Sequence, residues 1–306
     1  MASVDPRRLE LLLQLSRLGS MRAVADVMGV TTSTVSQQIA ALAQEAGTTL
    51  LEHEGRGVRL TPAGRRLADH AVNVLAALDA ARADLDPDAT PRGTLRVAAF
   101  GSAIRDVVLP VMRRLGDDHP ELRLSIHEHE PGESLELLDG DHVDLALTYD
   151  YNLGPAKFAA TLVTQPLGTT AWGLGMPADD ARSVPATSLE AFDRYREHDW
   201  IVNSRNTADE EAVRTVASLA GFEPRVVHRA DSLELVQDMI AEGLGVGLLP
   251  AALTTIPAVA VQTLDRPAVT LRSYAVSRRG RAVWPPLALV LRLLADGPPE
   301  RVASSR

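Results

Sequence analysis

The amino-acid sequence predicts an α+β protein built from several domains. Three patterns along its 306 residues support this prediction. The N-terminal part contains short segments with apolar residues at helical spacing, joined by glycine turns. One long apolar seam follows, and beyond it segments typical of strands and of helices alternate to the end. We therefore expect a small helical domain at 1–61, a linker helix and hinge at 62–92, and a larger α/β domain at 93–306.

Two short helices joined by a tight turn are predicted between Ser20 and Gly47. From Met21 onward, apolar residues recur at i, i+3, i+4 and i+7, which places them on one helical stripe. Ser20 can cap this helix, and Gly29 can supply the left-handed residue that ends it. A second capped start at Thr31 begins the next helix. Its own apolar stripe is formed by Val35, Ile39 and Leu42.

The opposite side of the second predicted helix carries short or planar hydrogen-bonding groups. Such groups can reach base edges and phosphates in a major groove. Together with the two caps, the candidate DNA contacts are Ser20, Thr31, Thr32, Ser33, Ser36 and Gln37. Taken alone, an amphipathic helical hairpin with a glycine turn is equally typical of small helical proteins without a nucleic-acid partner. The flanking segments favour the DNA-binding interpretation.

The segment after these helices, LLEHEGRGVRLTPAG, predicts a β-hairpin beside the second helix. Leu50 and Leu51 anchor its first strand, Val58 and Leu60 anchor its second, and 53–57 forms a charged turn that contains glycine. A hairpin in this place is a wing that can contact the DNA backbone. Its candidate contacts are His53, Arg56 and Arg59.

A long helix is predicted from Thr61 to Asp86. A capping threonine and a proline at the first helical position precede a run rich in Ala, Leu and Arg. The apolar residues alternate in spacings of four and three, as in a coiled coil. They are Leu67, Ala71, Val74, Leu78, Ala81 and Leu85. A narrow seam favours pairing with a second copy over a long helix packed on its own domain, which is the alternative.

The remainder of the chain predicts a mainly parallel sheet with helices on its faces, because strands and helices alternate. The first series has strands LRVAAF, LRLSIHEH and VDLALTYD and helices at 102–117 and 132–139. The second has strands TTAWGLGM, WIVN, RVVHRA, GVGLLP and VAVQTL and helices ADEEAVRTVASLAG and SLELVQDMIAEG; LRSYAVS and a helix near 284–295 close the chain. We expect two lobes, 93–162 with 267–296 and 163–266, and a ligand cleft between them.

The expected ligand site lies at the carboxyl ends of the strands. Helix N-termini there present N–H groups and a partial positive charge. This rule selects Phe100, Gly101, Ser102, Thr148, Tyr149, Asn203, Ser204, Arg205 and Thr207. A small polar or anionic effector is therefore expected. Ser102 and Thr207 are equally interpretable as plain helix caps, and Arg205 as a solvated loop residue.

Composition limits the classes of function. The chain has no cysteine, which excludes disulfides, thiolate metal sites and thiol-based redox sensing. It shows no long apolar run and no secretory signal, so we expect a cytoplasmic protein without a membrane span. The net charge of −9 is uneven, with +1 in residues 1–70 and −10 in the rest. The acidic part is therefore expected to lie away from DNA.

Motifs for catalysis, cofactors and metals are weak. GLGVG at 243–247 follows a helix and precedes a strand, the reverse of the order in a dinucleotide-binding loop. HEHE at 127–130 places two histidines on one strand face without a third ligand, which favours a sheet edge or a dimer surface over a metal site. No GxSxG, HExxH or P-loop pattern occurs. We expect no catalytic residues, no cofactor and no metal.

The run LELLLQLSRLGSMRAVADVMGVTTSTVSQQIAALAQEAGTTLLEHEGRGVRLTPAG closely resembles the winged helix-turn-helix domain of LysR-type transcriptional regulators. The region 93–296 is similar to their effector-binding domain, which has a periplasmic-binding-protein-like architecture, most clearly in GFEPRVVHRADSLELVQDMIAEGLGVGLLP. The resemblance implies a ligand-responsive regulator that reads an inverted-repeat promoter site in double-stranded DNA. It also implies a homodimer or homotetramer, paired through the linker helix and effector domain, that contacts RNA polymerase. The family usually has arginines near Gln37 and His53, and this chain departs from that pattern.

Two other functions stay open from the residues themselves. The lobes alone could carry the function of a binding protein, with the N-terminal domain as an interaction module. The third hypothesis is an enzyme, although the sequence shows no recognisable set of catalytic residues.

Overall fold

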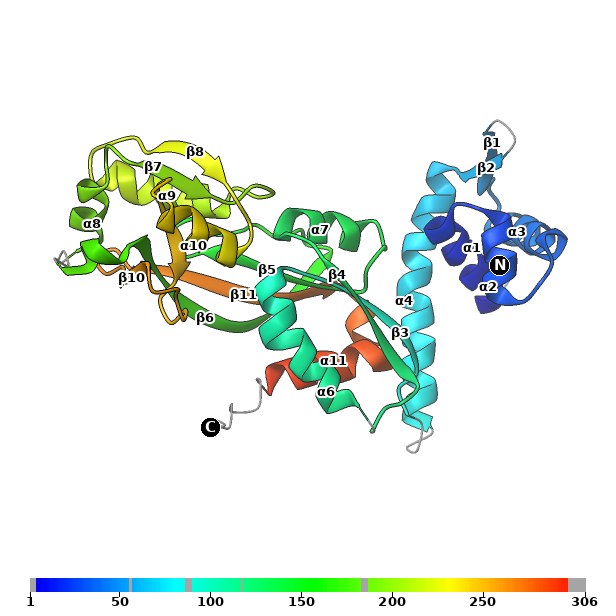
Figure 1. Cartoon of the computed structure of the whole chain (residues 1–306). Coiled ribbons are helices and arrows are strands. Elements are labelled where there is room, and N and C mark those ends of the chain that lie inside the picture. Colours follow the sequence, from blue (N-terminus) through cyan, green and yellow to red (C-terminus); the bar gives the residue numbers. More distant parts are fainter. Residues whose placement is uncertain (1–3, 55–56, 86–89, 117, 183–186, 297–306) are drawn as a thin grey trace.

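The computed structural model describes residues 4–54, 57–85, 90–116, 118–182 and 187–296. A helical N-terminal domain and a long helix stand beside a larger α/β domain (Figure 1). The N-terminal domain consists of α1 (Pro6–Leu18), α2 (Met21–Met28), α3 (Thr32–Ala46) and an antiparallel hairpin of β1 (Leu51–Glu54) and β2 (Gly57–Leu60). No helix in the described ranges is both long enough and apolar enough to cross a membrane.

The predicted caps shape the helix pair. The Ser20 side chain accepts a hydrogen bond from the Ala23 amide, and Gly29 adopts φ +65° to end α2. Thr31 then accepts from the Thr34 amide at 3.1 Å and starts α3. Because non-glycine residues are strained at such a φ, glycine fixes the angle between the two helices. The apolar faces of α1, α2 and α3 meet in one core that includes Leu12, Val24, Val35, Ile39 and Leu42.

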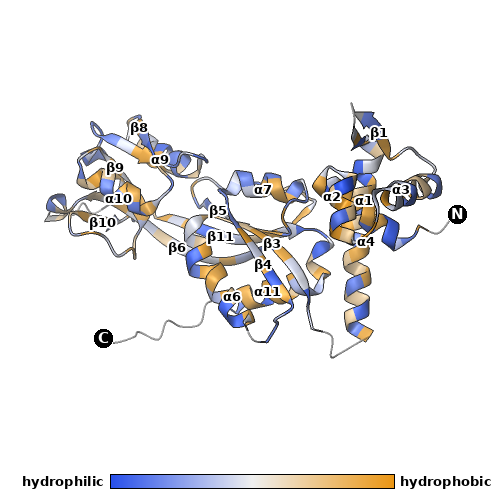
Figure 2. Ribbon diagram, turned by 45° about the vertical axis from the view of Figure 1, so that its right-hand side comes forward, coloured by the Kyte–Doolittle hydropathy of each residue, from blue (hydrophilic) through white to orange (hydrophobic). Residues whose placement is uncertain are grey.

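The long helix α4 (Pro62–Leu85) uses two faces. Ala68, Ala71 and Val72 are buried in the core of the N-terminal domain. Part of the predicted seam therefore packs within the subunit, whereas Val74 is 44% exposed and Leu85 is 87% exposed. Figure 2 shows apolar residues continuing along α4 beyond the N-terminal helices that cover its first half. The second half of the seam is the part left available to a partner.

Within the described residues, nine strands form one sheet in the order β4-β3-β5-β11-β6-β9-β7-β8, with β10 also paired to β6. The strands are β3 (Gly93–Ala99), β4 (Leu122–Glu128), β5 (Leu145–Tyr151), β6 (Leu162–Pro177), β7 (Asp199–Val202), β8 (Arg225–Arg229), β9 (Val246–Pro250), β10 (Val259–Thr263) and β11 (Val269–Arg278). β3, β4 and β5 are parallel to one another, as are β7, β8 and β9. These two parallel groups form the cores of a first and a second lobe.

Helices cover both lobes. The first lobe has α5 (Gly101–Ala103), a π-helical turn (Ile104–Val108), α6 (Leu109–Leu115), α7 (Pro131–Asp139) and α11 (Pro285–Ala295). The second lobe has α8 (Ser188–Arg194), α9 (Ala208–Leu219) and α10 (Leu233–Ala241). Short 3-10 turns follow β6 at Ala178–Arg182 and precede α11 at Arg281–Val283. The single helix expected at 102–117 is thus interrupted by a π-helical turn. α8 lies in a segment for which the sequence suggested only a connection.

Strands β6 and β11 join the lobes. They pair antiparallel over ten positions, and β11 also pairs with β5 of the first lobe. The remaining length of β6 pairs with β9 and β10 of the second lobe. β6 is therefore twice the length expected from TTAWGLGM, because it serves both lobes. The predicted lobe boundaries at 162 and 266 fall at the start of β6 and just before β11.

A group of charged residues connects the N-terminal domain and α4 to the first lobe. We call it the charged junction; it consists of Arg17, Asp69, Arg96, Asp141, Asp144, Arg278 and Arg281. Arg17 of α1 contacts Asp141 at 2.8 Å, and Arg278 at the end of β11 contacts Asp69 of α4 at 3.0 Å. Behind them, Asp144 is buried between Arg96 and Arg281. Breaking a buried ion pair of this kind typically costs about 3–5 kcal/mol.

The exposed half of the α4 seam predicts self-association. Replacing both Val74 and Leu78 with glutamate should reduce the molar mass in solution to that of a monomer, because charges would enter an apolar seam. Size-exclusion chromatography with light scattering measures the mass, and circular dichroism checks that the helices are retained. Arg66→Glu, on an exposed part of α4 outside the seam, is the matched control and should leave the mass unchanged. A parent protein that is already monomeric would contradict this role of α4.

Candidate functional site

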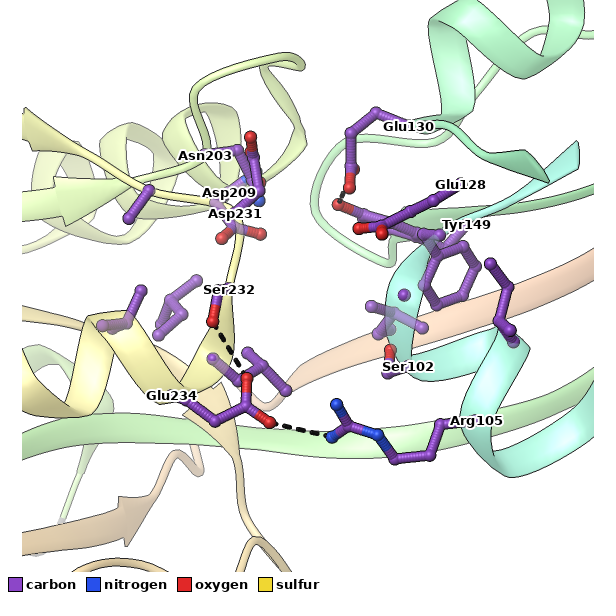
Figure 3. Close-up of a pocket in the computed structure, with 18 of the residues that line it drawn as sticks. Ser102, Arg105, Glu128, Glu130, Tyr149, Asn203, Asp209, Asp231, Ser232 and Glu234 are labelled. Carbon is purple, nitrogen blue, oxygen red and sulfur yellow. Dashed lines mark hydrogen bonds and ion pairs between the residues drawn. The ribbon is translucent and has the colours of Figure 1, made fainter.

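A cavity of about 460 Å³ lies between the two lobes. This volume is in the range of small-molecule binding sites. In Figure 3, Ser102, Arg105, Glu128, Glu130 and Tyr149 reach it from one side, and residues of the second lobe reach it from the other. The second-lobe residues labelled there are Asn203, Asp209, Asp231, Ser232 and Glu234. As expected for parallel sheets, the cavity lies at the carboxyl ends of strands.

Aromatic rings line one wall of the cavity. Phe100 and Tyr149 meet edge to face at 4.8 Å between ring centroids, and Tyr151 stands in the same arrangement against Trp172 at 5.5 Å. Phe100, Tyr149 and Trp172 border the cavity, together with aliphatic residues such as Leu248 and Leu271. The site therefore combines an apolar body with a limited number of polar groups, as ligand pockets generally do.

Five carboxylates border the same cavity: Glu128, Glu130, Asp209, Asp231 and Glu234. Asp209 and Glu130 are the deepest polar groups among them, with 8% and 5% of their surface exposed. Tyr151 donates to Asp209 at 2.7 Å, and Tyr149 donates to Glu130 at 3.2 Å. With its amide nitrogen turned toward Asp209, Asn203 donates to both carboxylate oxygens at 2.9 and 3.0 Å. The deep end of the cavity is thus a polar, negatively charged network.

Two arginines near the cavity are held by these carboxylates. Arg105 donates to Glu234 at 2.8 Å, which connects the two lobes across the cavity (Figure 3). Arg205 donates to Asp231 at 3.1 Å and lies within 4 Å of Glu128 and Glu130. Both guanidinium groups are therefore already paired by the protein itself.

The crowded carboxylates perturb one another. Burial raises the pKa of Asp209 to about 7; the nearby Glu130 and Asp231 contribute in the same direction, against the hydrogen bond from Tyr151. Burial and the charge of Asp231 also raise the pKa of Glu130. For Asp231, hydrogen bonds from Ser204 and Arg205 outweigh burial and lower the pKa. Asp209 is thus poised to change its charge near neutral pH.

The structure brings together about half of the effector residues predicted from sequence. Those that line the cavity are Phe100, Gly101, Ser102, Tyr149 and Asn203. Thr148 lies on the opposite face of β5 from Tyr149, because successive strand residues alternate. Ser204 and Arg205 lie behind the wall, bound to Asp231, and Thr207 donates to Glu211 on its own helix. These four are not among the residues that border the cavity in the described part of the chain.

Among the cavity residues that the sequence did not predict are all five acids. Glu128 and Glu130 belong to the HEHE run, which the sequence suggested as an edge or a dimer surface; β4 is indeed the edge strand, but its end opens on the cavity. Asp231 likewise lies two residues after the end of β8. The same strand-end rule, applied to β4 and β8 as well as to the other strands, would have selected these residues.

The expectation of a small polar or anionic effector rested on helix N-termini, and acidic side chains of the protein already lie at those helix starts. Glu130 and Glu133 form a capping box at the start of α7. Asp209 lies in the first turn of α9, and Glu234 in the first turn of α10. A Cβ at Gly101, where α5 begins, would lie 3.3 Å from the Glu128 carboxylate. The favourable interaction of each helix start with negative charge is therefore satisfied within the chain.

The second candidate site is the outer surface of α3. Thr32, Ser33, Ser36 and Gln37 are exposed, whereas Val35 and Ile39 on the other side of the helix are buried. Figure 1 shows α3 on the side of the N-terminal domain that faces away from the large sheet. The caps Ser20 and Thr31 are exposed at the starts of α2 and α3. This polar surface is accessible in the single chain, as a groove-reading helix requires.

The β1–β2 hairpin carries the wing residues. His53 is exposed on β1, and Arg59 on β2 forms an exposed ion pair with Glu52 at 2.9 Å. Exposed pairs of this type are weak, so a phosphate can replace Glu52 as the partner of Arg59. The predicted contact Arg56 lies outside the described residues.

Two family models match the parts of the chain that carry these two sites. Residues 6–65 match the model described as bacterial regulatory helix-turn-helix protein, lysR family. Residues 88–298, more than half of the chain, match the LysR substrate binding domain. The chain belongs to the LysR family. In this LysR protein, the first match spans α1 to the start of α4 and the second contains the cavity, so a DNA-binding module and a ligand-binding module occur in one chain.

Other LysR-family proteins are similar over most of this chain. IlvR of Caulobacter vibrioides is 27% identical over 286 residues, covering 89% of this chain and 91% of that protein. GltC of Bacillus subtilis is 26% identical over 220 residues, covering 71% of each. Full-length OxyR of Pseudomonas aeruginosa, with a cysteine replaced by aspartate, has a TM-score of 0.73 at 20% identity and covers 97% of this chain and 95% of that chain. CbnR in complex with its target DNA has a TM-score of 0.53 at 20% identity, covering 95% and 99%. These two structures establish the likeness of fold.

The raised pKa of Asp209 predicts that the stability of the folded protein decreases as the pH rises from 4 to 7. The unfolded chain releases the Asp209 proton near pH 4, whereas the folded chain keeps it until about pH 7. Between pH 4 and pH 7 only the unfolded chain releases this proton, so the stability of the fold decreases as the pH rises through this range. Asp209→Asn should stabilise the protein at pH 8 by up to about 4 kcal/mol, and much less at pH 4. Urea unfolding followed by tryptophan fluorescence measures this difference.

Asp144→Asn is the matched control. Although burial opposes it, the guanidinium of Arg96, with that of Arg281, lowers the pKa of Asp144. That carboxylate therefore stabilises the fold above the pH at which it ionises, and its loss should destabilise the protein at pH 8. An Asp209→Asn variant that is less stable than the parent at pH 8 would contradict the prediction. It would show that other groups stabilise the ionised carboxylate in the folded protein.

Proposed function

We propose that this LysR-family regulator binds double-stranded DNA through α3 and the β1–β2 hairpin and senses a small molecule in the cavity between its lobes. The observation that carries the proposal is the exposed polar face of α3, which lies in the same chain as a two-lobed ligand cavity. Thr32, Ser33, Ser36 and Gln37 contact base edges and phosphates, and Ser20, Thr31, His53, Arg56 and Arg59 contact the backbone. CbnR, which is similar in fold, has been solved with its target DNA, and this supports the assignment.

A pair of chains would read an inverted repeat. Two-fold symmetry of a dimer matches half-sites in opposite orientation, and the exposed half of the α4 seam supplies the pairing surface. Dimers could then pair into tetramers through their effector domains, residues 93–306. Such a regulator acts in the cytoplasm, where it meets genomic DNA and RNA polymerase. Its role is binding; catalysis is not needed for any part of it.

This chain cannot sense a signal through a covalent change of a cysteine thiol. A cysteine-to-serine variant of OxyR from Corynebacterium glutamicum, with a TM-score of 0.58 at 19% identity, has been solved with H2O2 bound. The present chain contains no cysteine, so it cannot use a thiol as its sensor. The cavity of about 460 Å³ supports reversible binding of a small molecule instead.

The signal would travel along β11. Leu271 of this strand borders the cavity, and Arg278 at its other end pairs with Asp69 of the linker helix. A ligand that prefers one arrangement of the lobes would shift the charged junction and so the angle between paired DNA-binding domains. Regulation then requires a difference in ligand affinity between the two arrangements.

Gln37 and Arg59 should affect DNA binding differently. Gln37→Ala should lose about 1–3 kcal/mol of discrimination between a selected site and a site with one changed base pair, because a base contact is lost. Arg59→Ala should weaken binding to all sequences alike and reduce the slope of log K against log salt by about one unit. Fluorescence anisotropy with labelled duplexes over a salt series measures both quantities.

Gln44→Ala, an exposed change at the other end of α3, is the control and should bind as the parent does. If the parent dimer failed to bind DNA at low salt, the function would lie in the lobes alone, with the N-terminal domain serving as an interaction module. If Gln37→Ala and Arg59→Ala both matched the parent, another surface would contact DNA.

A further inference from the structure

We propose that the effector is a small organic cation, an ammonium compound with an apolar body, bound by the carboxylates of the cavity. This inference rests on the function proposed above and specifies the chemistry of its ligand. The sequence-based expectation was a small polar or anionic effector. The cation proposed here departs from the anionic alternative, because acids outnumber arginines at the cavity.

The charge balance of the cavity is negative. The five carboxylates Glu128, Glu130, Asp209, Asp231 and Glu234 face two guanidinium groups, Arg105 and Arg205. When all are ionised, three negative charges remain in excess. An anionic ligand would meet this excess. The exposed Arg105–Glu234 pair is weak and is itself no obstacle to an anion, so it is the excess of acids and the buried Glu130 and Asp209 that disfavour one. A cation instead supplies the charge that the site lacks.

The deep end of the cavity is built for a donor group. Asp209 and Glu130 are more than nine-tenths buried, and like charges in a water-poor site repel one another strongly. An ammonium group has three N–H donors and no acceptor, so it can bridge several carboxylate oxygens at once. The raised pKa of Asp209 agrees with this geometry, since burial raises it and the neighbouring Glu130 and Asp231 act in the same direction.

The rest of the lining selects an organic cation rather than a metal ion. Within the described residues, no group of three or more His, Asp or Glu side chains is arranged to hold a metal. Phe100, Tyr149 and Trp172 instead present aromatic surface beside the acids, and aromatic faces attract organic cations. Among the described residues, the buried indole nitrogen of Trp172 has no hydrogen-bond partner.

The test uses full-length protein and pairs of compounds that share a body but differ in charge. Suitable probes are 2-phenylethylamine, 3-phenylpropanoate and 2-phenylethanol, with 1,5-diaminopentane and pentanedioate as an aliphatic pair and CaCl2 and MgCl2 as metal arms. Isothermal titration calorimetry measures each affinity. We expect an amine to bind at least tenfold more tightly than its carboxylate and alcohol counterparts. Absence of binding by every amine, or binding of a carboxylate or metal ion at least as tight, would overturn the proposal.

Two variants connect the binding to the cavity. Asp209→Asn keeps an acceptor for Tyr151 and Glu130→Gln keeps one for Tyr149, but each removes a negative charge. Each should weaken amine binding at least tenfold. Glu211→Gln, an exposed acid on the same helix as Asp209 that does not border the cavity, should leave the affinity unchanged. Equal weakening by Glu211→Gln would indicate a general surface charge effect and overturn the proposed site.

A pH series gives a second readout. Asp209 faces Glu130 just before α7, Asp231 after β8, Asn203 after β7, and Tyr149 and Tyr151 of β5. Burial raises the pKa of Asp209 to about 7, and the two nearby acids act in the same direction. Amine binding would favour the ionised carboxyl, so the affinity should rise several-fold from pH 6 to pH 8 and level off above. Asp209→Asn should abolish most of this rise. A parent affinity that is independent of pH would contradict the part assigned to Asp209.

The test also separates the proposal from the function on which it rests. DNA binding by the same protein is measured by anisotropy, alone and with each probe. Carboxylate binding that alters DNA affinity would overturn the cationic effector and leave the regulator intact. Amine binding by a protein that binds no DNA would support the cationic ligand and contradict the DNA-binding function.

Discussion

Strand β11 is the constraint on which the rest of the molecule depends. One end lies at the cavity, where Leu271 forms part of the wall, and the other end places Arg278 against α4. Its ten residues span about 30 Å, and pairing with β5 and β6 makes the strand stiff. β11 pairs with β5 of the first lobe and with β6, the strand that continues into the second lobe, so it connects the cavity wall to the residues that hold the linker helix. Fold and regulation therefore share one element.

Two buried aspartates show how differently the chain treats charge in its two regions. Asp144 in the charged junction is held between Arg96 and Arg281, and its pKa is lowered. Asp209 in the cavity has only hydroxyl and amide partners near other acids, and its pKa is raised. The first arrangement stabilises the fold, whereas the second costs stability. A site that binds a cation accounts for this loss of folding stability, since the bound cation supplies the positive charge that the acids lack.

The sequence predicted what local rules determine. The caps Ser20, Gly29 and Thr31, the polar face of α3 and the strand ends at Phe100 and Asn203 follow from short-range patterns. The length of β6 and the burial of Ala71 depend on partners distant in sequence. Glu130 and Asp231 were missed because the strand-end rule was not applied to β4 and β8, whereas only the folded structure shows that Asp209 borders the same cavity. The helix starts suggested a bound anion, but acids at those same helix starts already supply the negative charge.

The most direct test of the connection between cavity and DNA-binding domain is a distance measurement across the charged junction. The chain has no native cysteine, so spin labels can be attached at cysteines that replace the exposed Gln44 of α3 and Glu136 of α7. Double electron–electron resonance, with labelled chains diluted in unlabelled protein, then reports the distance within one subunit. A rigid junction predicts one narrow distribution that broadens when Arg17 and Arg278 are both replaced by alanine. A broad distribution in the parent, or a narrow one that survives both replacements, would contradict the account.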